Sequence, residues 1–328
     1  MKKIRKILVP TDFSDGAAEA YPFAQRFSEK FGGKIDFIHV IPTAKYFSES
    51  IKKLGVPFDM EEDLFPHIIE EAEHQLENIM DDYVVDANKG EFFVKIDRRP
   101  SDTIVEHAKE HGYDMILMGA RGKHESDILR GTITEKVIRY SETPVLTISG
   151  DMPGKGLQRI LLPTDTSEIS YLSLPWAISM AEIFDGEITF FNVIELYGSL
   201  SENIPHEPGK SEMLAIYEDI IEEAGNYLSN HGYDNMHIER GDEAYEDQLV
   251  IQNGSYSQTI NLHTRVVKGV SAHYEIEDFA RENIDLVVMT THGRSGLAHM
   301  FLGSTTENVA KYVSKPVLTV RPHEKHLK

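Results

Sequence analysis

The chain has 328 residues, which is long for a single hydrophobic core and suits two domains. It carries 33 Lys and Arg against 54 Asp and Glu, and both halves are acidic, which disfavours binding to nucleic-acid phosphates. Cysteine is absent, which excludes disulfides and Cys-ligated metals, and no apolar run is long enough to span a membrane, so we expect a cytoplasmic protein.

Apolar runs rich in β-branched residues alternate with helix-forming segments in the first half of the chain. The apolar runs predict buried strands over residues 4–9, 35–41, 92–96, 115–118 and 145–148. The segments between them predict helices over residues 15–31, 61–83, 102–111 and 133–140. This alternation is typical of a doubly wound α/β domain, in which helices cover both faces of a parallel sheet.

The second half repeats the first, because short motifs recur in the same order. Ile-Leu-Val-Pro-Thr-Asp-Phe-Ser at residues 7–14 returns as Ile-Leu-Leu-Pro-Thr-Asp-Thr-Ser at residues 160–167, and three further motifs recur in the same order. A Gly/Pro-rich stretch separates the two copies. We therefore predict two tandem domains, residues 1–149 and 157–322, each with a five-stranded parallel sheet.

The second copy is longer than the first, and its extra residues fall between Ile194 and Asp285. The polar stretch 234–261 is the candidate insertion. Within it, Asn253 and Gly254 separate two strand-like runs, which predicts a β-hairpin closed by a type I′ turn at these two residues.

An aspartate follows the first strand of each copy, at the carboxyl end where open parallel sheets bind ligands. Asp12 and Asp165 are placed to accept hydrogen bonds from the ribose hydroxyls of a nucleotide. The same residues also suit a helix N-cap or an Asx-turn, and the residues alone leave both interpretations open.

A glycine-bearing loop follows the fourth strand of each copy and leads into a helix. Glycines let backbone N–H groups turn toward an anion, and a helix start adds donors, so such loops can hold phosphates. The second loop carries Arg294 and no acidic residue, whereas the first is one residue shorter and carries Glu125 and Asp127. The electrostatic case for phosphate binding is therefore stronger in the second copy.

The starts of the two following helices have a second interpretation that needs no ligand. Ser304 with Glu307, and Thr132 with Glu135, have the spacing of a capping box, in which side chains satisfy the first N–H groups of a helix. The residues alone leave the capping and phosphate-binding interpretations open.

Four features, repeated in order, resemble the universal stress protein family in its tandem two-domain form. They are the hydrophobic-Pro-Thr-Asp start, the His/Asn-Val-Ile strand end, the Gly-x2-Gly-x9-Gly-Ser/Thr loop and the Pro-Val-Leu-Thr strand. The resemblance covers nearly the whole chain. It implies flavodoxin- or Rossmann-like domains whose last strands pair within the chain as a pseudo-dimer, which can form a homodimer in turn.

The resemblance also implies an adenine-nucleotide site in each domain, taking ATP or AMP with or without Mg²⁺. The aspartate would hold the ribose, the backbone of a valine would meet the adenine, and the loop would line the phosphates. The implied residues of the second domain are Pro163, Thr164, Asp165, Val193, Met289, Thr290, Gly293, Arg294, Gly303, Ser304 and Thr305. Those of the first domain are Pro10, Thr11, Asp12, Val40, Gly119, Gly122, Gly131 and Thr132.

The two implied sites depart from the family pattern differently. Thr290 stands where the family has its first glycine, but the nine-residue spacing from Gly293 to Gly303 is kept. The first copy keeps the opening glycine, Gly119, but has a shortened spacing before Gly131. We expect the second site to be the better occupied.

We expect a stress-response protein that senses or signals nucleotide state and is not an enzyme. The P-loop, the dinucleotide-binding Gly-x-Gly-x-x-Gly and the nucleophile elbow are absent. His107 and His111 are four residues apart but lack the glutamate of a zinc-binding His-Glu-x-x-His, so we expect exposed histidines and no metal site. The alternatives are a nucleotide-free scaffold that binds a protein partner and a weak ATP hydrolase.

Overall fold

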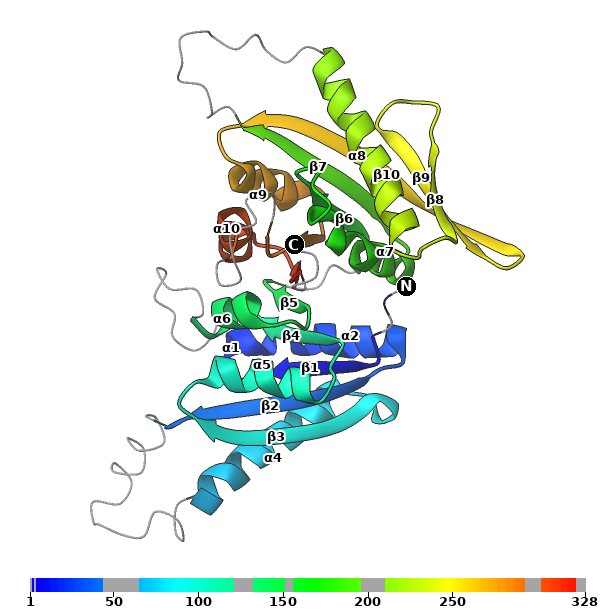
Figure 1. Ribbon diagram of the computed structural model, residues 1–328. Coiled ribbons are helices and arrows are strands. Elements are labelled where there is room, and N and C mark those ends of the chain that lie inside the picture. Colours follow the sequence, from blue (N-terminus) through cyan, green and yellow to red (C-terminus); the bar gives the residue numbers. More distant parts are fainter. Residues whose placement is uncertain are drawn as a thin grey trace. The chain divides into compact units, whose positions relative to one another are not determined.

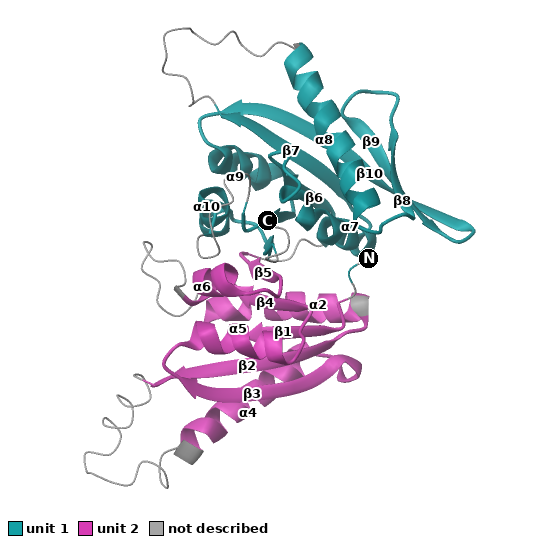
Figure 2. Cartoon of the chain, viewed as in Figure 1, with its two compact units in different colours: residues 1–2, 152–328 teal, residues 3–151 magenta. Residues whose placement is uncertain are grey.

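The computed structural model describes residues 2, 4–43, 65–120, 132–150, 156–195, 210–292 and 302–322. The chain divides into two compact units, one of residues 3–151 and one of residues 1–2 with 152–328 (Figure 2). Each unit contains one copy of the repeated pattern, and we call them the first and the second domain.

The first domain is built on five parallel strands in the spatial order β3-β2-β1-β4-β5 (Figure 1). They are β1 (Lys6–Pro10), β2 (Lys34–Pro42), β3 (Lys89–Asp97), β4 (Met115–Gly119) and β5 (Val145–Ile148). Ile7 of β1 pairs with Ile35 on one side and Met115 on the other, so the strand order reverses at β1. The predicted α/β fold is confirmed, and its switch point lies where ligands bind in open parallel sheets.

The helices of the first domain follow the predicted order, with one correction. They are α1 (Asp15–Ala18), α2 (Tyr21–Phe31), α4 (Phe65–Tyr83), α5 (Pro100–Glu110) and α6 (Thr132–Tyr140), with a 3-10 turn η1 (Asp86–Asn88). The single helix predicted over residues 15–31 is wrong, because two helices occupy it. Pro22 lies in the first turn of α2, and in a continuous helix its ring would clash with the carbonyl group of Ala18.

The second domain has five parallel strands extended at one edge by two antiparallel ones, in the order β12-β11-β6-β7-β10-β9-β8. They are β6 (Arg159–Pro163), β7 (Glu187–Glu195), β8 (Met236–Arg240), β9 (Glu246–Asn253), β10 (Tyr256–Gly269), β11 (Leu286–Thr290) and β12 (Val317–Val320). Residues 256–263 of β10 pair antiparallel with β9, and residues 262–269 run parallel with β7. The long β10 thus joins the insertion to the predicted five-stranded parallel sheet, and β9 and β8 extend that sheet to seven strands.

The turn of the β9–β10 hairpin lies one residue later than predicted. Asn253 pairs with Tyr256, so the two turn residues are Gly254 and Ser255. Gly254 has a φ of 65°, and Ser255 is not among the residues with positive φ. A glycine with positive φ followed by a residue with negative φ is typical of a type II′ turn, which replaces the predicted type I′ turn.

The helices of the second domain are α7 (Leu174–Phe184), α8 (Lys210–Asn230), α9 (Ala272–Asn283) and α10 (Ser304–Tyr312), with a 3-10 turn η2 (Ser170–Ser173). Helix α8 packs on β8 and β10 (Figure 1). On that side the strands bury Leu249, Ile251 and Ile260, and the hydroxyl of Tyr217 in α8 lies 3.1 and 3.0 Å from the carboxylate oxygens of Asp247. None of the helices described is long and apolar enough to cross a membrane.

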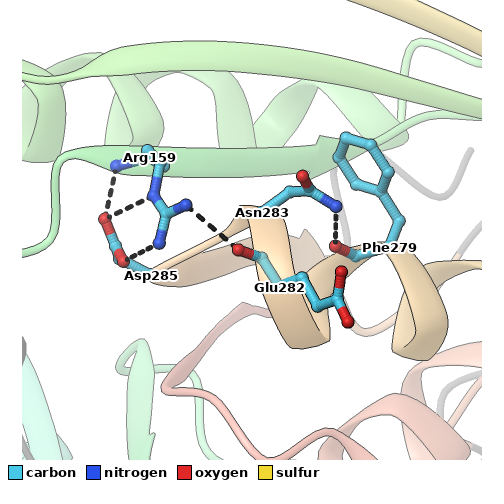
Figure 3. A network of polar contacts seen from close by, with 5 residues as sticks. All are labelled: Arg159, Phe279, Glu282, Asn283 and Asp285. Atoms are coloured by element: carbon cyan, nitrogen blue, oxygen red, sulfur yellow. Dashed lines mark hydrogen bonds and ion pairs between the residues drawn. The ribbon is translucent and has the colours of Figure 1, made fainter.

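An aspartate joins the amino ends of the two central strands in each domain. In the second domain, Asp285 accepts hydrogen bonds from the backbone N–H of Arg159 at 2.9 Å and from its Nη2 at 2.8 Å (Figure 3). Nη1 of the same arginine donates to the carbonyl oxygen of Glu282 at 3.1 Å. In the first domain, Asp114 accepts from the backbone N–H of Lys6 at 3.0 Å. The repeated aspartate thus has a structural role at the edge opposite the carboxyl ends of the strands.

The expectation of exposed histidines in α5 is wrong for His107, which is 1% exposed. Its ring centroid lies 4.5 Å from that of Phe93 and 4.1 Å from that of His111. Burial, together with smaller contributions from the neighbouring His111 and Lys95, lowers the pKa of His107 to about 4, so the ring is neutral at pH 7. The described residues contain no group of three or more His, Asp and Glu side chains that could hold a metal ion.

Candidate functional site

Two interlocked turns after β1 fix the orientation of Asp12. Thr11 Oγ1 accepts a hydrogen bond from the backbone N–H of Phe13 at 3.0 Å, and Asp12 Oδ1 accepts one from the backbone N–H of Ser14 at 3.1 Å. The hydroxyl of Ser14 also donates to Asp12 Oδ1 and accepts from the backbone N–H of Ala17, which caps α1. Asp12 therefore forms an Asx-turn, and the N-cap is Ser14.

The second domain builds the same pair of turns after β6. Thr164 Oγ1 accepts from the backbone N–H of Thr166 at 3.0 Å, and Asp165 Oδ1 accepts from the backbone N–H of Ser167 at 3.1 Å. No α-helix begins here, and the hydroxyl of Ser170 in η2 lies 2.7 Å from Thr164 Oγ1. The turns are thus a property of the Thr-Asp-x-Ser sequence and do not depend on the helix that follows.

The residue between the aspartate and the serine has a left-handed backbone in both copies. Phe13 has a φ of 61° and Thr166 a φ of 66°. This conformation costs about 1–2 kcal/mol for a residue with a Cβ atom, and the two turns hold the backbone in it. The same strain at equivalent places in two copies marks the turn as a candidate functional feature, because strain of this kind concentrates at ligand sites.

A side chain from the second strand anchors each turn. His39 Nδ1 lies 2.7 Å from the carbonyl oxygen of Thr11, and Asn192 Nδ2 donates to the carbonyl oxygen of Thr164 at 2.9 Å. A carbonyl oxygen only accepts, so Nδ1 of His39 carries the proton. The sequence motif contained these two residues, but sequence reasoning assigned a role only to the valine after them.

The two valines of the predicted site lie beyond the end of the first strand. Pro10 is the last residue of β1 to pair with β2, opposite Ile38, so Val40 extends past it at the carboxyl edge. Val193 extends in the same way past Pro163. Their backbones lie at the edge that carries the aspartate turn, where the resemblance places the adenine.

The last helix of each domain is attached to the end of the fourth strand. Thr134 Oγ1 of α6 donates to the carbonyl oxygen of Gly119 at 3.2 Å, and Thr306 Oγ1 of α10 donates to that of Thr290 at 2.8 Å. These bonds hold the amino ends of both helices at the carboxyl edge of the sheet. The positive end of each helix dipole therefore lies where phosphates are expected.

Of the two interpretations of the start of α10, the capping box does not form. The N-cap is Gly303, with no side-chain cap bond, and Ser304 is the first helical residue and is exposed. The backbone N–H of Gly303 donates to the carbonyl oxygen of Thr291, and that of Glu307 to Gly303, both at 2.9 Å. In the first domain α6 begins at Thr132, whose side chain lies outside the described residues.

Gly119 and Thr290 differ for a packing reason. A Cβ atom on Gly119 would lie 2.0 Å from the carbonyl oxygen of Gly16 in α1. The second domain has η2 in place of α1, and there Thr290 is buried and its hydroxyl donates to the carbonyl oxygen of His292 at 2.6 Å. The departure of Thr290 from the family glycine thus accompanies the loss of the short helix.

The described residues of the predicted site gather at the carboxyl edge of each sheet. Met289 is the last but one residue of β11, and Thr305 is the second residue of α10. A cleft of about 290 Å³ between α9 and strands β7 and β10 contains none of the predicted site residues. Four predicted residues of the phosphate loops lie outside the described part of the chain: Gly122, Gly131, Gly293 and Arg294.

Comparison with known sequences identifies relatives of both domains. The model of the universal stress protein family matches residues 3–149 and again 156–321. Universal stress protein MJ0577 of Methanocaldococcus jannaschii is 32% identical over 153 residues, which cover 44% of this chain and 94% of that protein. Universal stress protein Slr1230 of Synechocystis is 24% identical over 333 residues, which cover 97% of this chain and 100% of that protein.

Comparison with solved structures agrees at the level of the fold. The crystal structure of a universal stress protein from Archaeoglobus fulgidus superposes with a TM-score of 0.61 at 22% identity. The match covers 98% of this chain and 97% of that one, so the two chains have the same fold over nearly their whole lengths.

Proposed function

This chain belongs to the universal stress protein family, with one family domain in each half, and from this premise we propose that it binds adenine nucleotide at the carboxyl edge of each sheet. In this proposal it is a cytoplasmic stress-response protein that senses or signals nucleotide state without turning the nucleotide over. The observation that carries the proposal is the strained Thr-Asp-x-Ser turn, built twice with the same hydrogen bonds.

The turn supplies an oriented acceptor for the sugar. In the second domain, Ser167 engages Oδ1 of Asp165 through both its N–H and its hydroxyl, which fixes the plane of a half-buried carboxylate. An ionised carboxylate is an acceptor, and ribose offers two neighbouring hydroxyl donors. Backbone groups of Val193 would meet the adenine edge, and Asp12 and Val40 have the same roles in the first domain.

The helix starts supply the phosphate end of the site. The first N–H groups of α10 have no partner inside the helix, and the helix dipole favours negative charge beside them. Ser304 and Thr305 lie in this first turn. We propose the second site as the better occupied, because no acidic residue stands between Thr290 and Thr306 and the Gly293 to Gly303 spacing is kept.

Release of bound nucleotide and titration of an aspartate variant test this proposal. Protein denatured after purification should release ATP or AMP, identified by chromatography and mass. Asp165→Asn keeps an oxygen that accepts from Ser167 but loses the charge, so ATP affinity should fall about tenfold, as expected for a lost charge-assisted hydrogen bond.

Asp185→Asn is the matched control, because Asp185 is exposed at the carboxyl end of α7 and should leave ATP affinity unchanged. The proposal is contradicted if no nucleotide is recovered and the native protein binds neither ATP nor AMP. Phosphate released from ATP above background would contradict binding without turnover and favour the hydrolase alternative.

A further inference from the structure

The two turns carry different side chains at their strained position. In the first domain the ring centroid of Phe13 lies 4.4 Å from that of His39, with the ring planes tilted by 39°. The equivalent residues of the second domain are Thr166 and Asn192, neither of which has an aromatic ring. Phe13 and Thr166 have nearly the same backbone φ, so the two turns differ at this position in the side chain.

Phe13 is not placed to fill the core. It is half-buried, whereas His39 beneath it is 8% exposed. The backbone N–H of Phe13 donates to Thr11 Oγ1, and in the second copy the backbone N–H of Thr166 donates to Thr164 Oγ1 in the same way. The hydrogen bond therefore does not require a phenyl ring. A bulky residue in the left-handed region is uncommon, and what Phe13 adds to the turn is its aromatic face.

Each ring of the pair belongs to a residue next in sequence to one of the two groups that define the proposed site. Phe13 follows Asp12, the proposed ribose acceptor, and His39 precedes Val40, the proposed contact of the adenine. The bond from His39 Nδ1 to the carbonyl oxygen of Thr11 fixes the imidazole, and the imidazole supports the phenyl ring. A half-buried aromatic ring is thus held in the turn that contains Asp12 and against the strand that carries Val40.

We infer that Phe13 is a base-stacking residue of the first site, so that the first domain holds the flat base of a nucleotide by stacking while the second domain relies on polar contacts. The inference rests on the proposed function. Stacking on an aromatic side chain accepts any base, because every base has a π-face, and a ring held in place before binding loses little entropy. The first site therefore depends more on the base, and less on the phosphates, than the second.

The test exchanges the two residues within the full chain. Phe13→Thr gives the first turn the residue that the second turn carries at the same φ, and Phe13→Leu keeps an apolar cover over His39 without an aromatic face. Both are titrated with AMP and with ribose 5-phosphate, with the second site disabled by Asp165→Ala. We expect AMP affinity to fall about tenfold in both variants, the size of a lost base stack, with ribose 5-phosphate affinity unchanged.

The reciprocal variant, Thr166→Phe, is titrated with the first site disabled by Asp12→Ala and should gain several-fold in AMP affinity. The inference is overturned if Phe13→Thr and Phe13→Leu bind AMP within twofold of the parent, or if ribose 5-phosphate affinity falls as much as AMP affinity. Binding of AMP to the parent with no effect of either variant overturns the inference and leaves the proposed function intact. Failure of the native chain to bind any nucleotide overturns both.

Discussion

Phe13 and Thr166, neither of which is glycine, have a left-handed backbone conformation in the turns that follow the first strand of each domain. Each turn is maintained by two short-range hydrogen bonds, in which the threonine hydroxyl and the aspartate carboxylate each accept from the backbone N–H two residues further on. The sequence motif Thr-Asp-x-Ser encodes these bonds directly, because threonine and aspartate are the side chains that form such turns. The strained residue itself carries no such signal, since neither phenylalanine nor threonine favours positive φ.

The strain at Thr166 predicts an unusual response to glycine. Thr166→Gly removes the Cβ atom that makes a φ of 66° costly, whereas Thr166→Ala keeps it. We expect the glycine variant to have a free energy of unfolding about 1 kcal/mol higher than the alanine variant in urea titrations. A glycine variant that is the less stable of the two would show that the backbone at this position is unstrained.

Gly119 and Thr290 make a second matched pair. Gly119→Ala places a Cβ atom 2.0 Å from the carbonyl oxygen of Gly16, so α1 must move, and we expect a loss of more than about 2 kcal/mol in unfolding free energy. Thr290→Ala removes one buried hydrogen bond to His292, worth about 1 kcal/mol. Equal effects of the two substitutions in thermal melts would contradict the packing explanation for this glycine.

At the scale of elements, α5 and α9 occupy equivalent places but bury different side chains. Ala108 and Ala280 are fully buried in the two helices, and the residue before each is His107 in α5 and Phe279 in α9. Phe279 stacks on Phe191 with ring centroids 5.0 Å apart. The position before the buried alanine is therefore an apolar phenylalanine in α9 and a neutral histidine in α5.

The buried histidine predicts acid sensitivity of the first domain. His107 has a pKa of about 4 when folded and 6.5 as its ordinary value, so the unfolded chain binds the proton more strongly. Its contribution to stability is complete above pH 6.5 and is lost as the pH falls toward 4. His107→Phe, which copies Phe279, should flatten the decline in melting temperature between these pH values. An unchanged pH profile in this variant would mean that His107 does not ionise on unfolding.

The antiparallel extension of the second domain depends on a buried carboxylate. Asp247 is 3% exposed and accepts the hydroxyl of Tyr217, and Gly241 donates its N–H to the same side chain at 3.3 Å. Tyr217→Phe removes one donor, and we expect a loss of about 1–3 kcal/mol in the stability of this region, measured as faster amide hydrogen exchange in β8 and β9. Tyr256→Phe is the control, because Tyr256 is 67% exposed and should leave exchange unchanged.

Element types were predictable where the pattern was long and periodic, and boundaries were not. Continuous apolar runs predicted the parallel strands correctly. A strand that is buried on both faces is apolar at every position, whereas an amphipathic helix has polar residues between its apolar ones. The break between α1 and α2 required weighing Pro22 against strong helical periodicity on both sides of it. The type II′ turn at Gly254 required knowing the pairing of Asn253 with Tyr256, which the Asn-Gly pair does not determine.

The aspartate turns of the candidate site could be predicted from the sequence. Its turn is local in sequence, so Asp12 and Asp165 could be found by comparing the two copies. The contacts of His39 and Asn192 join separate strands, and only the fold brings the second strand beside the turn. The burial of His107 was also out of reach, because a histidine on a helix gives no sign of the face on which it lies.

At the scale of the whole molecule, one chain carries two copies of the same turn with different neighbours. The first copy has an aromatic pair beside its aspartate, and the second has polar side chains and a loop without acidic residues. We propose that both copies of the turn bind nucleotide.

Calorimetric titration of ATP with Mg²⁺ into the intact chain tests that claim most directly, with Gly303→Arg as the comparison. Gly303 is the N-cap of α10, and a Cβ atom there would lie 3.2 Å from the carbonyl oxygen of Thr291, so the arginine adds bulk and charge at the start of this helix. We predict at least one equivalent of ATP bound by the native chain and loss of the second-domain equivalent in the variant, with the melting temperature showing that the variant is folded. Absence of binding heat from the native chain at every temperature tried would contradict the account.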